Sequence, residues 1–202
     1  MLDRKAMPIL SVLILVMLVS DIWLITHDAR RSMALFTPPV TMMIVPGVFV
    51  LKERRAVASA DVLAAWKKWG SFFLISCAAI VTAFQLLPVF HRLGIPLPSP
   101  ELCFRLFVAS YGLVVVVSGN RAPKLPPLER RWHGVLSLGK EAQVAILRLA
   151  GWLLVSFGVT TIVIALFLPV RLIAPVMGSL ALAMLVALLV KHHQLRSSRL
   201  AH

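Results

Sequence analysis

Long apolar segments are the feature that most restricts how this chain can fold. Six of them are long enough, at about 20 residues, to cross a bilayer as helices. They cover residues 7–26, 34–51, 69–90, 102–119, 149–168 and 172–190. The sequence therefore predicts an all-α integral membrane protein, a bundle of about six transmembrane helices whose immediate partner is the lipid bilayer.

Composition agrees with this class and leaves no room for a separate soluble domain. Hydrophobic residues make up 59% of the 202 residues and charged residues 14%, against about 25% charged in soluble domains. Six spans of about 20 residues leave roughly 82 for tails and loops. We therefore expect one membrane domain, residues 1–202, with any function in the bundle or its short loops.

The segment 34–51 is the least regular of the six, because three prolines interrupt it. Pro38 and Pro39 are acceptable in the first turn of a helix, whereas Pro46 lies in the interior. The segment is therefore kinked or re-entrant if it is not a regular span. We favour a crossing because its 18 residues are uncharged and mostly apolar. Segment 7–26 is longer than the apolar part of a signal peptide, so we expect an uncleaved first span.

The distribution of charge predicts the orientation. With six spans, most of the 21 Lys and Arg residues lie in the tails and in the loops 52–68 and 120–148, on one side of the membrane. The positive-inside rule places those loops and the C-terminus in the cytoplasm. If 34–51 does not cross, the N-terminus moves to the other side without changing this balance. The net charge of +13 is thus assigned to loops facing lipid headgroups, and no nucleic-acid partner is expected.

Two shorter patterns predict a surface helix and a helix-packing face. Ser59 is placed to cap a short helix from Ala60 to Lys68 that lies on the membrane surface, with Trp66 and Trp69 at the interface. In the last span small residues recur every four positions and predict a face for close packing, within the bundle or against a second copy in a homo-oligomer. These residues are Ser179, Ala183 and Ala187.

Catalytic and metal-binding patterns are not found in the sequence. It offers no nucleophile constellation, no glycine-rich phosphate loop and no paired catalytic carboxylates. His192 and His193 are neighbours that point in different directions, which does not make a zinc site. Cys77 and Cys103 fall at different depths and are expected to be unpaired. We predict no enzyme activity, no cofactor and no metal.

Two charges inside predicted spans are the main candidates for an intramembrane site. Asp21 and Arg105 lie at matching depths near the outer ends of their helices. A charge in hydrocarbon is costly unless it is paired or hydrated, so the two form an ion pair in an outward cavity, or each reaches separately to the interface. A small transporter or channel subunit would use such a site.

The region after 102–119 carries a recognisable order of residues. A basic, tryptophan-containing loop separates the end of one apolar stretch from the start of the next, and its flanking residues are Gly119, Asn120, Glu141, Arg148 and Gly151. This order resembles the SdpI family of small multi-pass bacterial membrane proteins, named for an immunity protein against a secreted killing factor. The proline-bracketed segment from Pro38 to Pro46 is also similar to the second helix of that family.

The resemblance implies a bacterial inner (plasma) membrane protein with one of two activities. It implies immunity to an extracellular toxic peptide, or a signal-transduction receptor that binds a cytoplasmic protein. Gly119, Asn120, Glu141 and Arg148 are the positions carried over from the family. Gly119 is suited to end a helix, and Asn120 to hydrogen-bond the freed carbonyls. The basic loop is suited to an acidic partner surface and adds the candidate residues Arg130, Arg131 and Trp132.

Overall fold

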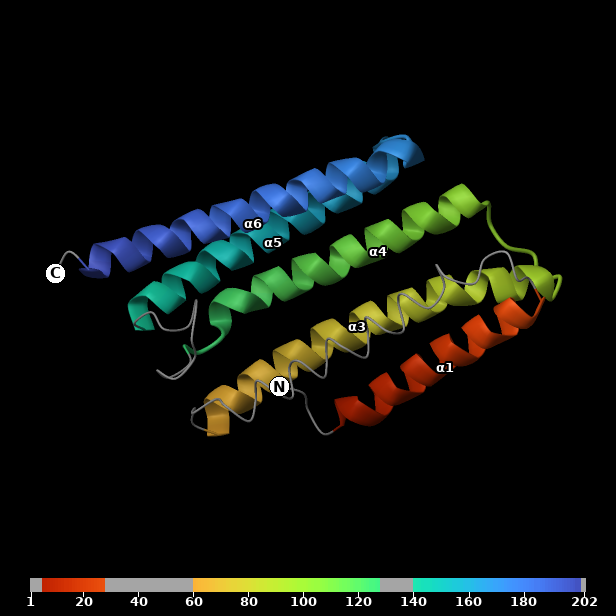
Figure 1. Ribbon diagram of the computed structural model, residues 1–202, viewed down its shortest axis with the longest axis horizontal. Helices are drawn as coiled ribbons and strands as arrows, with labels where there is room; N and C mark the ends of the chain where they lie inside the picture. Colours follow the sequence, from red (N-terminus) through yellow and green to blue (C-terminus); the bar gives the residue numbers. More distant parts are fainter. Residues whose placement is uncertain (1–4, 28–59, 128–139, 201–202) are drawn as a thin grey trace.

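Five long helices make up the part of the chain that the structure describes. The structure is a computed structural model that describes residues 5–27, 60–127 and 140–200, with the side chains of residues 21, 24, 25, 27 and 196–200 left out. The helices are α1 (Ala6–His27), α3 (Ala60–Arg92), α4 (Pro100–Arg121), α5 (Lys140–Phe167) and α6 (Val170–Leu200). A single 3-10 turn, η2 (Ala122–Lys124), follows α4 directly (Figure 1).

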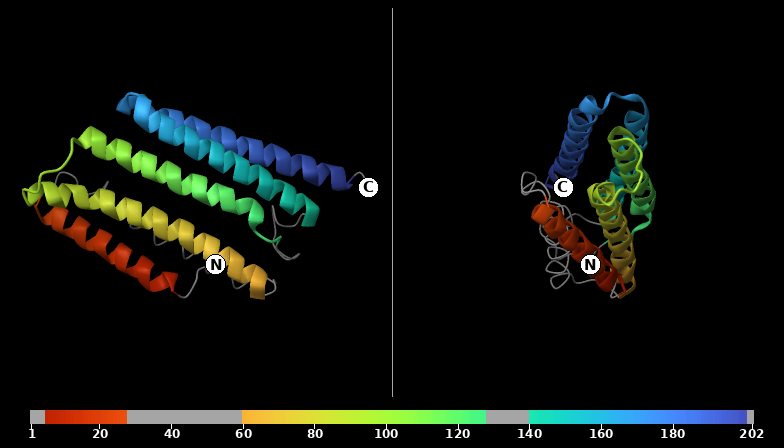
Figure 2. Two further views of the ribbon diagram at one scale, coloured as in Figure 1. Left: turned by 180° about the vertical axis from the view of Figure 1, so that it is seen from behind. Right: turned by 90° about the vertical axis from the view of Figure 1, so that its right-hand side faces the viewer.

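The helices lie side by side in the order α1, α3, α4, α5, α6, with α1 and α6 at the edges (Figures 1 and 2). α1 and α3 run in the same direction, and α4, α5 and α6 then alternate. The starts of α1 and α3 therefore share one end with the C-terminus, as the first and third crossings of a six-span chain would. We call this the basic end, because it carries Lys67, Lys68, Arg121, Lys124, Lys140 and Lys191.

Four of these helices are long and apolar enough to cross a membrane, namely α3, α4, α5 and α6. α1 contains a shorter apolar stretch, Ala6–Ser20. Large apolar side chains such as Leu113, Trp152 and Leu182 are exposed on their surfaces, as lipid-facing residues are. The predicted all-α class is therefore confirmed for the described residues, and four helices are long and apolar enough to span a membrane, whereas segment 34–51 lies outside the described residues and six spans are not shown.

The expected surface helix over 60–68 is not a separate element. α3 continues without a break from Ala60 to Arg92, because no proline lies between Lys68 and the span and Gly70 is accommodated inside the helix. Trp66 and Trp69 are hydrogen-bonded to the end of α4 and the residues after it, as described below. Ser59 lies outside the described residues.

The closest helix contact is between α4 and α5, and glycines make it possible. Gly112 and Gly119 on α4 face Gly158 and Gly151 on α5, with a spacing of seven residues on each helix. A Cβ atom added to Gly158 would lie 2.6 Å from the Gly112 carbonyl oxygen, and one on Gly119 would lie 2.9 Å from that of Gly151. The two backbones therefore touch, and any side chain at these positions would push the helices apart.

The small residues of α6 do not make a contact of this kind. Ser179, Ala183 and Ala187 are all exposed, and among the described residues nothing lies within 4 Å of a Cβ built on Gly178. α6 packs instead through larger residues near its start, where Ile173 joins a buried cluster with Ile164 of α5. The predicted packing face is thus wrong for the described bundle, and its use by a second copy stays a prediction.

Candidate functional site

The end of α4 is fixed against α5 at Gly119, the first of the residues that resemble the SdpI family. α4 continues past Gly119, which keeps a helical backbone, and ends at Arg121 because Pro123 has no N–H to offer the Gly119 carbonyl. The Ala122 N–H bonds that carbonyl instead and begins the turn η2. A Cβ on Gly151 would lie 2.8 Å from the Gly119 oxygen and 2.5 Å from Pro123. Gly119 therefore does not end the helix as expected, but lets α4 and η2 lie on α5.

α3 binds the same segment through two tryptophan side chains and through a cation–π contact. Trp69 Nε1 donates to the Ser118 carbonyl at 3.1 Å, and Trp66 Nε1 donates to the Pro126 carbonyl at 2.9 Å. The guanidinium of Arg121 lies 4.5 Å from the centre of the Phe72 ring, a cation–π contact. The segment that leaves α4 is thus bound on both sides before the chain reaches residue 128.

The remaining carried-over residues lie at the surface of this end. Asn120 is exposed in the last turn of α4, and Glu141 and Arg148 are exposed on the first three turns of α5. Their seven-residue separation places Glu141 and Arg148 on the same side of α5. Together with the lysines of the basic end they form an exposed polar surface at the end of adjoining helices. Arg130, Arg131 and Trp132 lie outside the described residues.

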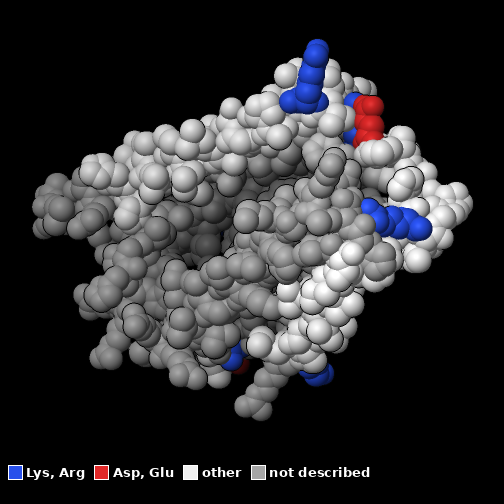
Figure 3. Space-filling view, turned by 45° about the vertical axis from the view of Figure 1, so that its right-hand side comes forward, with Lys and Arg blue, Asp and Glu red and all other residues white. Residues whose placement is uncertain are grey.

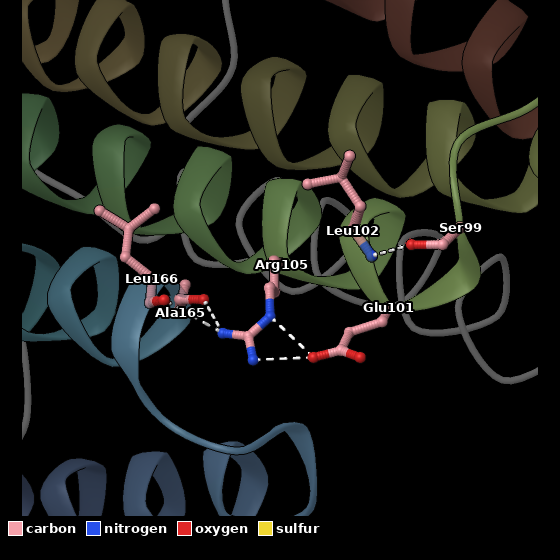
Figure 4. A network of polar contacts seen from close by, with 6 residues as sticks. All are labelled: Ser99, Glu101, Leu102, Arg105, Ala165 and Leu166. Atoms are coloured by element: carbon pink, nitrogen blue, oxygen red, sulfur yellow. Dashed lines mark hydrogen bonds and ion pairs between the residues drawn. The ribbon is translucent and has the colours of Figure 1, made fainter.

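Arg105 has partners that the sequence analysis did not assign (Figure 4). Its Nε and Nη2 donate to Glu101 Oε1 at 3.1 and 2.8 Å, and its Nη1 donates to the carbonyls of Ala165 and Leu166 at 2.7 and 3.3 Å. Those carbonyls belong to the last turn of α5, where no backbone N–H of the helix is left to bond them. Arg105 thus links the start of α4 to the end of α5, with its side chain 21% exposed.

The proposed pair of Arg105 with Asp21 stays a prediction. Asp21 belongs to α1, which packs on α3, but its side chain is outside the described ones. Glu101 was detectable in the sequence, because acidic and basic residues four apart on a helix commonly pair. The predicted span begins at Leu102 and leaves Glu101 in a loop, so the sequence analysis does not assign this pair.

A cavity of about 630 Å³ lies between the end of α3 and the start of α4, at the end of the bundle opposite the basic end. Sequence reasoning did not find it, because it depends on how the connecting loop folds back. Among the described residues that Figure 3 shows, charged side chains are few and mostly basic. The cavity is lined by Phe84, Leu87, Pro88, His91, Arg92, Leu97, Pro98, Ser99, Pro100 and Cys103.

The residues suited to metal binding or redox chemistry are scattered. Within residues 5–27, 60–127 and 140–200, no three His, Cys, Asp or Glu side chains come together as a metal site would require. Cys77 is buried in α3, Cys103 lies half-buried in α4, and both are free thiols.

Comparison with known proteins finds no match for this chain among family models, curated proteins or solved structures. The similarity to the SdpI family therefore rests on the residues themselves.

Proposed function

We propose that this chain is a multi-pass protein of the bacterial inner membrane that acts by binding another protein. As in the SdpI family, it serves either as immunity to an extracellular toxic peptide or as a signal-transduction receptor for a cytoplasmic partner. Its C-terminus and basic end face the cytoplasm in this proposal, and it is not an enzyme. The observation that carries the proposal is the contact between Gly119 and Gly151.

That contact gives a physical reason for two of the residues that suggest the family. Each glycine is needed for the backbones of α4 and α5 to touch, so the pair defines one fold element and not two isolated positions. Asn120, Glu141 and Arg148 then lie exposed around it. Since the helix ends that carry these side chains are already fixed in place, little backbone freedom is lost on binding, which suits this surface to a protein partner.

The charge of the surface favours a particular partner. Lysines and arginines outnumber Glu141 and Asp61 at this end, so an acidic protein face would be attracted and oriented. The loop with Arg130, Arg131 and Trp132 connects α4 to α5 and belongs to the same end by its place in the sequence. We assign it to the partner surface.

The test is a crosslinked pull-down of the full-length chain from native membranes. We expect one stoichiometric cytoplasmic protein with the wild type, and its loss with Arg130→Ala/Arg131→Ala/Trp132→Ala at matched expression. Asn120→Ala/Arg148→Ala should weaken the same capture. The control is Arg171→Ala, which removes an exposed arginine at the opposite end.

The outcomes separate the two activities. A captured cytoplasmic protein that is lost only with the basic-end variants supports the receptor. Capture of an extracellular peptide, unaffected by the basic-end variants, supports immunity. If neither kind of partner is stoichiometric, or if the control loses it equally, the interaction proposal fails.

A further inference from the structure

We propose that the cavity between α3 and α4 binds one phospholipid from the leaflet at that end of the bundle. The phosphate lies beside His91 and Arg92, and an acyl chain lies against the apolar wall. This inference depends on the membrane class of the protein and not on its proposed partner.

The cavity is built by a loop that is fixed at both ends. Gly94 has a φ of 75°, and the Gly94 and Ile95 N–H groups donate to the carbonyls of His91 and Phe90, which is the Schellman arrangement that ends a helix. At the other end Ser99 Oγ accepts from the Leu102 N–H at 3.3 Å and begins α4. The cavity is therefore present before a ligand arrives, as in most small-molecule sites.

The inner wall is apolar and held in position. Phe84 packs on Phe107 with 4.6 Å between ring centres, and on Phe104 at 6.5 Å. Leu87 and Leu97 complete this wall from α3 and from the loop. A volume of 630 Å³ falls within the range of about 300–1,000 Å³ found for small-molecule sites. Hydrocarbon is the ligand chemistry that such a wall accepts.

The charged residues at the cavity opening, which we call the rim, indicate which amphiphile the cavity accepts. His91 and Arg92 are exposed residues of the last turn of α3, and none of the ten lining residues is acidic. Glu101, in the first turn of α4, is bonded to Arg105. The cavity also lies at the end of α3, and the ends of helices that span a bilayer lie near the headgroups. An apolar wall under a basic rim at that depth matches the acyl chain and phosphate of a phospholipid.

Cys103 provides a direct probe, because its thiol belongs to the cavity wall. The experiment uses the full-length protein with Cys77→Ala, purified in detergent, and follows the rate of maleimide reaction at Cys103 as phosphatidylglycerol is added. We expect the reaction to slow to saturation. Arg92→Gln should raise the half-maximal lipid concentration by about fivefold, since one basic side chain near anionic headgroups contributes this much. Arg92→Lys should retain most of the protection.

Two further arms identify the source of protection. Inorganic phosphate alone and diacylglycerol alone should both protect poorly, because the first lacks the chain and the second lacks the charge. Arg171→Gln is the matched control, since Arg171 is an exposed arginine at the same end that does not line the cavity. Protection by inorganic phosphate equal to that by the lipid would overturn the proposal, and so would equal protection by diacylglycerol. Unchanged reactivity at all lipid concentrations, or an Arg171→Gln effect as large as that of Arg92→Gln, would also overturn it.

Discussion

α4 and α5 pack closely against each other, whereas α6, which is also a long apolar helix, is mostly exposed. α4 and α5 touch along glycines, are joined by Arg105 at one end, and are joined by η2 at the other. Only 6% of the most apolar stretch of α6 is buried, against 28% in α5. Because lipid is as apolar as leucine, apolar surface alone does not drive two membrane helices together. Close packing therefore requires small residues on both partners, facing each other.

The largest expected effect comes from filling the glycine contact. Gly158→Leu places a side chain where even a Cβ would lie 2.6 Å from the Gly112 carbonyl oxygen, which is backbone and not free to move aside. We expect a loss of about 3 kcal/mol, the upper part of the range for overpacked sites. It is measured as a fall in the unfolding temperature of the purified protein in detergent.

The control for this prediction is Gly178→Leu on α6. A Cβ there meets no described atom within 4 Å, so stability should be unchanged or slightly higher, since leucine favours helix over glycine. If both variants lose the same stability, the contrast between the two packings is wrong.

The polar link at the end of α4–α5 should have the next largest effect. Arg105→Gln removes the ion pair with Glu101 and the charged donor to the α5 carbonyls. With the side chain 21% exposed, we expect a loss of about 1–2 kcal/mol.

A double-mutant cycle identifies the partner of Arg105. Coupling of Arg105→Gln with Glu101→Gln, and none with Asp21→Asn, is the result expected from the hydrogen bonds of Figure 4. Strong coupling to Asp21 would instead support the intramembrane pair and the transport alternative.

This comparison also explains how far the sequence could predict the fold. Hydropathy located segments 7–26, 69–90, 102–119, 149–168 and 172–190, which all correspond to described helices, because a span is defined by length and composition. Small-residue spacing identifies one face of one helix, but not its neighbour. The stripe of α6 therefore attracted attention, whereas the contact of Gly119 with Gly151 needs two helices placed together.

The candidate site was predictable to a similar extent. Gly119 and Gly151 were recognised as a pattern, but their mutual contact became visible only in the structure. The cavity was not predictable, because it depends on the left-handed backbone of Gly94 and the cap of Ser99 acting on the same loop. Loop shape of this kind is not encoded in hydropathy.

A smaller effect is expected where α3 holds the end of α4. Trp69→Phe keeps an aromatic ring near Phe73 but removes the donor to the Ser118 carbonyl. One hydrogen bond of this kind contributes about 1 kcal/mol, so the unfolding temperature should fall less than for Arg105→Gln. A fall larger than that of Gly158→Leu would mean that α3, and not α5, positions the end of α4.

The smallest effect on the single chain is expected from the exposed stripe of α6. Ala183→Leu lies on a face that is exposed among the described helices. The free energy of unfolding should therefore change by no more than about 0.5 kcal/mol, measured as a small shift in the unfolding temperature.

Oligomeric state is then the informative readout, because a small-residue face that is exposed in one copy permits close approach of another. Crosslinking through Ser179→Cys, with Cys77→Ala/Cys103→Ala, should give a dimer band that Ala183→Leu abolishes if two α6 helices meet there. If the band is absent already without Ala183→Leu, the stripe makes no close contact between copies, and α6 differs from α5 in having no glycine-type contact on that face.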